Sequence, residues 1–404
     1  MSMNSDAGGA AGPLDGVRVL DLTTMISGPI ATMMLADQGA DVIKVESLEG
    51  DLVRDLGANR GGASATFVSA NRSKRSLAID LKSSEGLAAL RRLIPGCDVF
   101  VQNFRPGAVE RMGLGEDAVR ALRHDVVYVS ISGFGESGPY AHKRVYDPVI
   151  QALSGLAAIQ ADATGRPKMV RTIIPDKTTA VTAAQAITAA LFARERSGRG
   201  QHVRLAMLDV MVAYLWPEGM TGLTFVGGEV RASRAQIAQD LVFQTRDGYM
   251  TAGAVSDAEW RGLCRALERP EWLDDPRFAT PTGRIVNVQA RLELTAAVLR
   301  ERTTAEWLER LDRESVPCAP ILTREEVLTH PQIVENEILE ELEHPAAGRI
   351  RQPRPAARFA ETPARIRRPA PGLGEHSREI LREGGIDERE IGRLVAAGIV
   401  RAAG

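Results

Sequence analysis

Cysteine, histidine and long apolar runs are all scarce in this 404-residue sequence. The three cysteines, Cys97, Cys264 and Cys318, are far apart and odd in number, which argues against a disulfide framework and against a structural zinc site. The six histidines are scattered without metal-ligand spacing, so no metal site is predicted. Such sparse cysteine usage is typical of the reducing cytoplasm, where we expect the protein to be found.

Charge, aromatic content and apolar length exclude further classes of protein. The net charge of −2 gives no overall attraction to nucleic acid or to an anionic membrane, so any phosphate site must be local. Aromatic residues make up 4% of the chain, and no stacking platform for a ring system is evident. No run reaches the roughly 18 apolar residues of a membrane span. Residues 1–13 lack the features of a signal peptide, and we expect a flexible tail there.

The first half of the chain alternates short apolar runs with helical patterns, which predicts an α/β fold with a largely parallel sheet. Strands are expected at residues 17–22, 41–45, 77–81, 99–101, 126–132 and 201–205. Helices are expected at residues 28–35, 84–93, 108–122, 179–195 and 207–215.

A second domain is expected because the chain exceeds the roughly 250–300 residues at which a single core stops growing. The composition shifts to Gly, Thr and Arg after residue 218, and residues 244–249 then read as a strand, a turn and a strand. Helical patterns follow at residues 259–267 and 304–311, while Pro and Arg dominate residues 345–372, which predicts an extended connector.

Two glycine-containing motifs are weak matches. Residues 133–138 fit GxGxxG after a strand, but no apolar helical stripe follows, so a loop is predicted instead of a dinucleotide site. The GxSxG motif of serine hydrolases fails as well, because Pro139 stands where its last glycine is required.

A local surplus of positive charge lies between residues 71 and 82, where Arg72, Lys74, Arg75 and Lys82 face the single Asp80. Phosphate groups favour such clusters. The alternative is a solvated strand edge, because charged edges also prevent aggregation.

Asp176 directly precedes an alanine-rich apolar run that Gly198 closes. This placement predicts an Asp at a helix N-cap and a glycine just past the helix end. The run leaves no polar face, so a buried helix is expected. A carboxylate at its start is ionised at neutral pH and can act as a nucleophile without a general base, although simple capping is the plainer interpretation.

Several segments, taken in order, resemble the class III CoA-transferases. They are residues 14–21, 27–29, 35–46, 71–76, 103–107, Asp176, 197–201 and 373–376. The resemblance implies a Rossmann-like large domain built from residues 14–218 and 341–404, a smaller α+β domain within residues 219–340, and two interlocked ring-shaped chains in a homodimer.

The resemblance also implies a function and a set of site residues. The activity would be transfer of CoA between carboxylic acids, with acyl-CoA as a substrate and no tightly bound cofactor. Asp176 would be the nucleophile, passing through an aspartyl mixed anhydride and an aspartyl-CoA thioester. The implied CoA contacts are Ser27, Ile79, Asp80, Leu81, Lys82, Asn103, Phe104, Arg105, Arg111, Lys143, Arg144, Val145 and Tyr146.

Departures from the family pattern narrow the alternatives. Formyl-CoA transferases resemble one another in having Gln and Arg at two positions where this sequence has Ile26 and Ser47. The glycine-rich loop of those enzymes is reduced in this sequence to Gly227–Gly228. These departures argue against oxalate and formate as substrates. The related α-methylacyl-CoA racemases use a His/Asp pair, but Tyr146 stands at the matching histidine position and is a poor base. A CoA-binding protein without catalysis is the remaining alternative.

Overall fold

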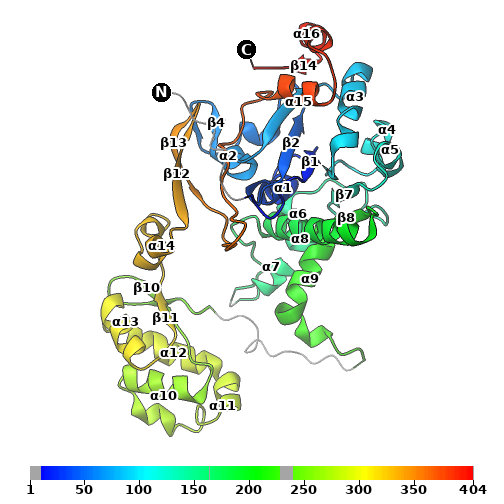
Figure 1. The fold of residues 1–404 in the computed structure, drawn as a ribbon. Coiled ribbons are helices and arrows are strands. Elements are labelled where there is room, and N and C mark those ends of the chain that lie inside the picture. The colour runs from blue at the N-terminus through cyan, green and yellow to red at the C-terminus, as the bar shows by residue number, and fades with distance from the viewer. Residues whose placement is uncertain (1–10, 163, 228–239, 404) are drawn as a thin grey trace. The chain divides into compact units, whose positions relative to one another are not determined.

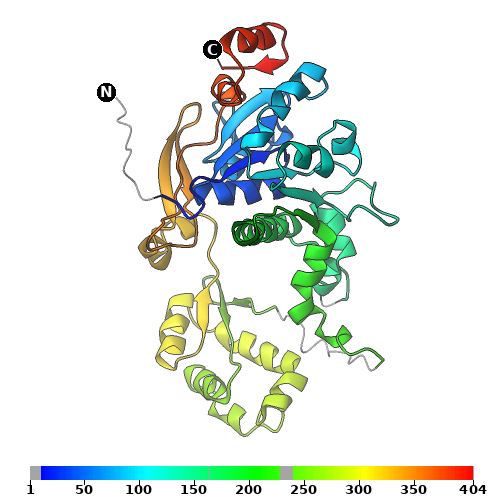
Figure 2. The same ribbon diagram turned by 45° about the vertical axis from the view of Figure 1, so that its right-hand side comes forward.

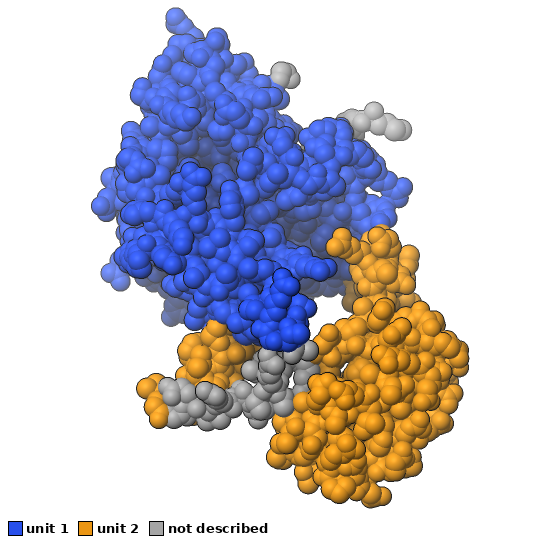
Figure 3. Space-filling view, turned by 180° about the vertical axis from the view of Figure 1, so that it is seen from behind, with its two compact units in different colours: residues 1–214, 337–404 blue, residues 215–336 orange. Residues whose placement is uncertain are grey.

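The computed structural model describes residues 11–162, 164–227 and 240–403 (Figure 1). The chain divides into two compact units, one made of residues up to 214 together with residues 337–404, and one made of residues 215–336 (Figure 3). Both divisions fall close to the predicted domain boundaries at residues 218 and 340. Gly12 lies close to the main chain of Gln38, so the predicted flexible tail is wrong for this residue, and residues 1–10 of that tail lie outside the described residues.

A seven-stranded sheet in the order β14-β5-β2-β1-β6-β7-β8 organises the first unit. Its neighbours pair in parallel except for β14, which runs antiparallel to β5. The predicted α/β fold with a parallel sheet is confirmed, whereas β14 was not predicted. The strands are β1 (Arg18–Asp21), β2 (Asp41–Glu46), β5 (Arg75–Ile79), β6 (Val99–Gln102), β7 (Val127–Ser132), β8 (His202–Ala206) and β14 (Val400–Arg401).

Helices cover both faces of this sheet (Figure 1, Figure 2), which is why its central strands read as continuous apolar runs. On one face, α1 (Ser27–Asp37) and α8 (Ile174–Ser197) enclose a core that includes Val101 and Ile187. On the other face, the core contains Phe100 and Tyr128. The helices contributing to it are α3 (Ser84–Arg91), α4 (Ala108–Arg111), α5 (Glu116–Leu122), α15 (Ser377–Glu383) and α16 (Glu388–Ala396).

Two sequence predictions for the first unit are corrected by the structure. The helix predicted over residues 108–122 is broken into α4 and α5, because Gly113 adopts a left-handed conformation with φ of 65°. The connector predicted over residues 345–372 begins with a strand of the hairpin β12 (Leu339–His344) and β13 (Gly348–Pro353). Gln352 of that hairpin donates to the carbonyl of Val68 at 3.0 Å.

Short elements complete the first unit. They are β3 (Asn59–Arg60), β4 (Ala63–Ser64), α2 (Ala65–Asn71), α6 (Asp147–Leu153), α7 (Leu156–Ile159), α9 (Met207–Gly219), which continues into the second unit, and the 3-10 turns η1 (Leu52–Arg54) and η2 (Ile94–Gly96).

The second unit packs helices against a small antiparallel sheet, as expected for an α+β domain. Its core gathers Trp260, Trp272, Phe278 and Trp307. Residues 228–239 of the Gly-, Thr- and Arg-rich segment after residue 218 lie outside the described residues, and Gly228 of the reduced glycine-rich loop is among them. The elements are η3 (Thr221–Leu223), β9 (Phe243–Gln244), β10 (Tyr249–Ala252), α10 (Asp257–Ala266), η4 (Pro270–Leu273), α11 (Pro281–Val286), α12 (Val288–Leu299), α13 (Thr304–Arg313), β11 (Cys318–Pro320), η5 (Glu326–Leu328) and α14 (Pro331–Glu335).

In the described part of the chain, no helix combines the length and apolar character required to cross a bilayer.

Arg72, Lys74 and Arg75 of the basic cluster are buried inside the protein. For these three side chains, both a phosphate site and a solvated strand edge were wrong interpretations. Arg72 pairs with Asp37 at 2.8 Å, and Arg75 pairs with Asp41 at 2.6 Å. Lys74 is fully buried and its ammonium lies 3.0 Å from the Asp21 carboxylate. Burial lowers the pKa of Lys74 to about 8, although Asp21 opposes that shift. The lysine therefore remains mostly charged at neutral pH, in a pair that cannot be hydrated.

Lys74→Met is expected to lower the free energy of unfolding by about 3–5 kcal/mol, because it leaves the buried Asp21 carboxylate without its nearest cation. The exposed Lys82 supplies the matched control, and Lys82→Met is expected to change stability by no more than about 0.5 kcal/mol. Urea unfolding followed by circular dichroism compares the two variants. Equal midpoints would contradict a structural role for the buried pair.

Candidate active site

Asp176 lies in the first turn of α8, as the third residue of the helix. Ile173 occupies the N-cap position and makes no side-chain cap, so the predicted N-cap position of Asp176 was wrong. The predicted end is confirmed, because Gly198 closes α8 with a left-handed φ of 67°. The carboxylate therefore projects from the helix and is available to other groups.

One side of α8 packs against α1, and the other side is exposed in the single chain. Ala180, Ala183 and Ile187 are fully buried, whereas Val181 and Phe192 are 54% and 65% exposed. The prediction that α8 is buried all round is therefore wrong for the single chain. Its outer side mixes exposed apolar residues with the exposed Lys177, Gln185 and Glu195.

The side chain and the main chain of Asp176 are each held by a different residue. Ser27, a buried residue at the start of α1, donates a short hydrogen bond from its Oγ to Asp176 Oδ1. The backbone N–H of Asp176 donates to Asp147 Oδ2 at 3.2 Å. Asp147 thus satisfies one of the free N–H groups at the start of α8, which a cap residue would otherwise satisfy.

Asp147 is fixed in turn by its own helix. It begins α6 and is 3% exposed, and its Oδ1 accepts a hydrogen bond from Gln151 Nε2 at 2.6 Å. The Gln151 Oε1 accepts the N–H of Val170 at 2.9 Å, which links α6 to the segment leading into α8. Sequence reasoning assigned no site role to Asp147 or Gln151, although Asp147 directly follows Tyr146 in the stretch compared with the racemase His/Asp pair. The Asp-Pro pair at residues 147–148 also marks a helix start.

Burial raises the pKa of Asp176, and the nearby Asp147 carboxylate raises it further, while the Ser27 hydrogen bond opposes both effects. The net direction is opposite to the one that the helix N-terminus alone would give. A more basic carboxylate is a stronger nucleophile once it is ionised.

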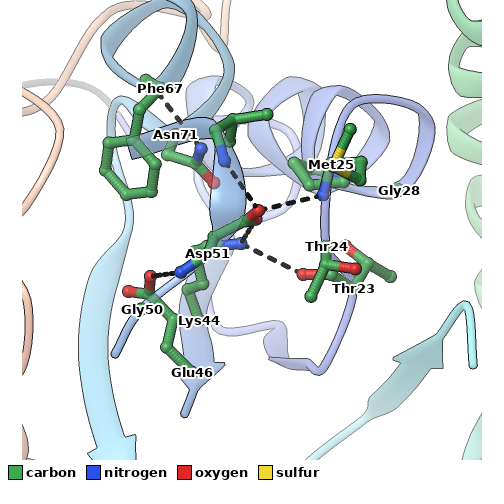
Figure 4. Close-up of polar contacts among 12 residues, drawn as sticks. Thr23, Thr24, Met25, Gly28, Lys44, Glu46, Gly50, Asp51, Phe67 and Asn71 are labelled. Carbon is green, nitrogen blue, oxygen red and sulfur yellow. Dashed lines mark hydrogen bonds and ion pairs between the residues drawn. The ribbon is translucent and has the colours of Figure 1, made fainter. Parts of the chain in front are cut away.

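A fully buried ion pair shapes the loop that carries Ser27 (Figure 4). The Lys44 ammonium lies 2.9 Å from Asp51 Oδ2 and also donates to the Thr23 carbonyl at 3.0 Å. Asp51 Oδ1 accepts the N–H of Met25 at 3.2 Å. Met25 has φ of 69°, a left-handed conformation that costs energy for a residue other than glycine. Buried charge therefore maintains a strained backbone two residues before Ser27.

Some of the predicted CoA contacts lie around Asp176. Asn103 accepts the N–H of Thr24 at 3.0 Å and donates to its carbonyl at 2.8 Å, which connects the end of β6 to the loop before Ser27. Lys143, Arg144, Val145 and Tyr146 lead directly into Asp147, and Tyr146 is 63% exposed.

Other predicted contacts are not joined to Asp176. The Ile79 side chain is fully buried in the core, so only its main chain can meet a ligand. Asp80 accepts the N–H of Lys82 at 2.9 Å, and Leu81 packs on the core. Phe104 and Arg105 line a cavity described below, and Arg111 is exposed on α4. Within the described residues, no hydrogen bond links any of these seven to Asp176, and their role stays a prediction.

Residues 133–138 form a loop, as predicted, and no helix begins there. Gly135 and Gly138 adopt left-handed φ values of 89° and 88°. A Cβ on Gly133 would lie 2.5 Å from a Val145 methyl group, so this glycine allows the loop to pack against the segment before Asp147. Over the described ranges, no three His, Cys, Asp or Glu side chains are grouped so that they could hold a metal ion.

Comparisons with known proteins cover nearly the whole chain. A family model described as CoA-transferase family III matches residues 14–377. The human succinyl-CoA:glutarate CoA-transferase is 35% identical over 396 residues, which are 96% of this chain and 90% of the relative. A succinate–glutarate CoA-transferase from Agrobacterium fabrum is 36% identical over 92% of this chain and 95% of its own. A CaiB/BaiF family protein structure from Brucella suis superposes with a TM-score of 0.80 at 30% identity, over 93% of this chain and 100% of that one.

The two partners of Asp176 are expected to shift its pKa in opposite directions. Ser27→Ala removes a donor to the ionised form and raises the pKa, whereas Asp147→Asn removes a neighbouring negative charge and lowers it. Carbodiimide reacts with the protonated carboxyl group, so the pH of half-maximal labelling of the Asp176 peptide, read by mass spectrometry, reports the change. Ser47→Ala, an exposed serine with no contact to Asp176, is the control. Shifts of the same sign in both variants would contradict this geometry.

Proposed function

The chain belongs to CoA-transferase family III, as the sequence resemblance predicted, and from this premise we propose that it transfers CoA from succinyl-CoA to a second carboxylic acid. The names of two relatives that match 92–96% of this chain support succinyl-CoA as donor and glutarate as acceptor. The observation that carries the proposal is the half-buried Asp176, whose carboxylate accepts from Ser27 and whose main-chain N–H donates to Asp147. We take short dicarboxylates as the acceptor class and CoA as a substrate, not a bound cofactor.

The proposed reaction uses Asp176 as a covalent carrier. An oxygen of its carboxylate attacks the thioester carbonyl, the C–S bond breaks, and CoA leaves as a thiolate. The thiolate then attacks the aspartyl carbonyl of the mixed anhydride, which releases the donor acid and leaves an aspartyl-CoA thioester. The acceptor carboxylate displaces CoA from Asp176, and the thiolate finally attacks the acceptor carbonyl. Each intermediate is activated to a degree similar to a thioester, so no stable intermediate accumulates while CoA moves between the acids.

The neighbours of Asp176 have distinct parts in this scheme. Desolvation and the Asp147 carboxylate disfavour the charged form of Asp176, so acylation, which removes that charge, relieves the repulsion. The Ser27 hydroxyl is the donor that would stabilise developing oxyanions, because the N–H groups of Ile174, Asp176 and Lys177 in the first turn of α8 are already hydrogen-bonded.

CoA would approach along the segments that flank Asp176. Asn103 and the chain from Lys143 to Tyr146 border the loop of Ser27 and the start of α6, and Lys143 and Arg144 supply positive charge for phosphate groups. Leu81, Lys82 and Arg111 remain proposed contacts for the nucleotide end.

We propose an interlocked homodimer, in keeping with the family. The exposed apolar side chains of the single chain support it. Val181 and Phe192 of α8, Tyr214 of α9, and Phe225 and Val226 beyond it are between 54% and 97% exposed. Apolar surface of this extent is typical of an interface.

Asp176→Ala is expected to abolish transfer from succinyl-CoA to glutarate while the melting temperature stays equal or rises. The raised pKa means that folding disfavours the ionised carboxylate at neutral pH, so its removal costs no stability through charge. Asp209→Ala, which removes an exposed first-turn aspartate of α9, is the matched control and retains activity. Product thioesters are read by mass spectrometry, and hydroxylamine added during turnover is expected to convert Asp176 to a hydroxamate.

The same assay in deuterated buffer tests the rivals. A racemase would exchange the α-proton of a 2-methylacyl-CoA without any acceptor acid, and a CoA-binding protein would leave all thioesters intact. Acceptor-independent exchange that is lost in Asp176→Ala would make Asp176 a base and overturn the proposal. If other carboxylic acids are supplied as acceptors and one of them, but not glutarate, receives CoA, only the proposed identity of the acceptor would change.

Interlocked chains cannot separate without unfolding, so sedimentation is expected to give a homodimer at every dilution at which the chain remains folded. Circular dichroism at each dilution reports folding. A folded monomer that increases on dilution would contradict interlocking.

A further inference from the structure

A cavity of about 550 Å³ lies on the face of the sheet opposite α8. Its walls come from β6, β7, β8 and the neighbouring α4 and α5, which lie together in Figure 1. Side chains alternate along a strand, so Ser130 points to the same face as Tyr128 of the core beneath α5, whereas Val129 points towards α8. The sheet therefore stands between this cavity and α8.

Three side chains lining the cavity form a continuous hydrogen-bonded chain. Ser130 Oγ lies 2.8 Å from His202 Nε2, and His202 Nδ1 lies 2.6 Å from Glu116 Oε2. An ionised carboxylate only accepts hydrogen bonds, so Glu116 fixes the His202 proton on Nδ1 and leaves Nε2 to accept the Ser130 hydroxyl proton. This is the polarity in which a histidine removes the proton of a serine nucleophile.

Neighbouring side chains fix the positions of Ser130 and His202. Ser130 is 8% exposed, as is the His202 side chain, and the His202 ring packs edge-on against Tyr128 with centroids 4.8 Å apart. Gln102 Nε2 donates to Ser130 Oγ at 2.9 Å, and its Oε1 accepts the N–H of Phe104 at 2.8 Å.

The charge of the cavity restricts its ligand. Glu110, Glu116, Asp117 and Glu136 outnumber Arg105 and Arg204 among the lining residues. Arg204 already pairs with Glu116 at 3.1 Å and with Glu136 at 3.0 Å. An excess of carboxylates disfavours the polyanionic CoA nucleotide, whereas a short neutral ester meets no such penalty.

We propose that Ser130, His202 and Glu116 form a second active site that hydrolyses short neutral carboxylic esters, independently of CoA transfer at Asp176. Ser130 Oγ bonds to the ester carbonyl carbon while its proton passes to His202 Nε2. The bond from that carbon to the alcohol oxygen breaks, and the leaving alcohol takes the proton from His202. Water, deprotonated by His202, then attacks the acyl-serine, which releases the acid and restores Ser130.

The test uses the full chain carrying Asp176→Ala, so that transfer chemistry cannot contribute. A fluorophosphonate probe is expected to label Ser130, located by peptide mass spectrometry, and p-nitrophenyl butyrate is expected to be hydrolysed. Ser130→Ala should lose both signals, and His202→Gln should slow both by about 10²-fold or more, the usual contribution of a general base. Ser132→Ala is the matched control. Ser132 lines the same cavity two residues further along β7, and its hydroxyl bonds the Leu205 carbonyl and the Gly135 N–H instead of His202.

The competing explanation is a polar chain that only ties β6, β7 and β8 to α5. In that case the folded protein would carry no label at Ser130, and Ser130→Ala and His202→Gln would lower the melting temperature without changing hydrolysis. Label on another serine, or label on Ser130 that His202→Gln leaves unchanged, would equally overturn the proposal. Circular dichroism confirms folding of each variant, and a Ser130→Ala variant that does not fold leaves His202→Gln and the position of the label to decide.

Discussion

Two buried lysine–aspartate pairs carry the loop on which the candidate active site depends. Lys74 contacts Asp21 at the end of β1 and also donates to the Pro29 carbonyl at 2.8 Å. Lys44 and Asp51 hold the same loop from the side of β2. Breaking one of these buried pairs would cost roughly 3–5 kcal/mol, because the remaining charge would stay buried without a partner. The loop conformation that keeps the pairs together is therefore stabilised by the same amount. The strained backbone of Met25 persists because this frame leaves it no alternative.

The three residues of the site come from separate parts of the sequence, but each occupies the same kind of position in its helix. Ser27, Asp147 and Asp176 each lie in the first turn of a helix, α1, α6 and α8 respectively. Helix starts present free N–H groups and partial positive charge. Two carboxylates can therefore lie close together while their main chains remain stabilised, and the repulsion between them raises the basicity of the one that is less buried.

Sequence reasoning succeeded where local rules decide the structure. Short apolar runs located β1, β2, β6 and β7, and Gly198 marked the end of α8. It failed where a distant residue decides. Lys74 was interpreted as a surface cation because its partner Asp21 lies 53 residues earlier. Asp147 contacts Asp176 across 29 residues, and Ser130 meets His202 across 72, so neither pair is visible as a motif.

The last strand of the sheet has a consequence for how the chain is made. β5 is covered on one side by β2. Its other side is covered by β14, which pairs with Ala78 and Ile79, and by His376 and Ser377, which hydrogen-bond the main chain of Ser76 and Ala78. During synthesis, residue 400 leaves the ribosome after the entire second unit, so β5 presents open backbone hydrogen-bonding groups throughout that interval. An uncovered strand edge pairs readily with other chains. The nascent protein is therefore most vulnerable to aggregation while residues 215–336 are being translated, although those residues take no part in the exposed edge.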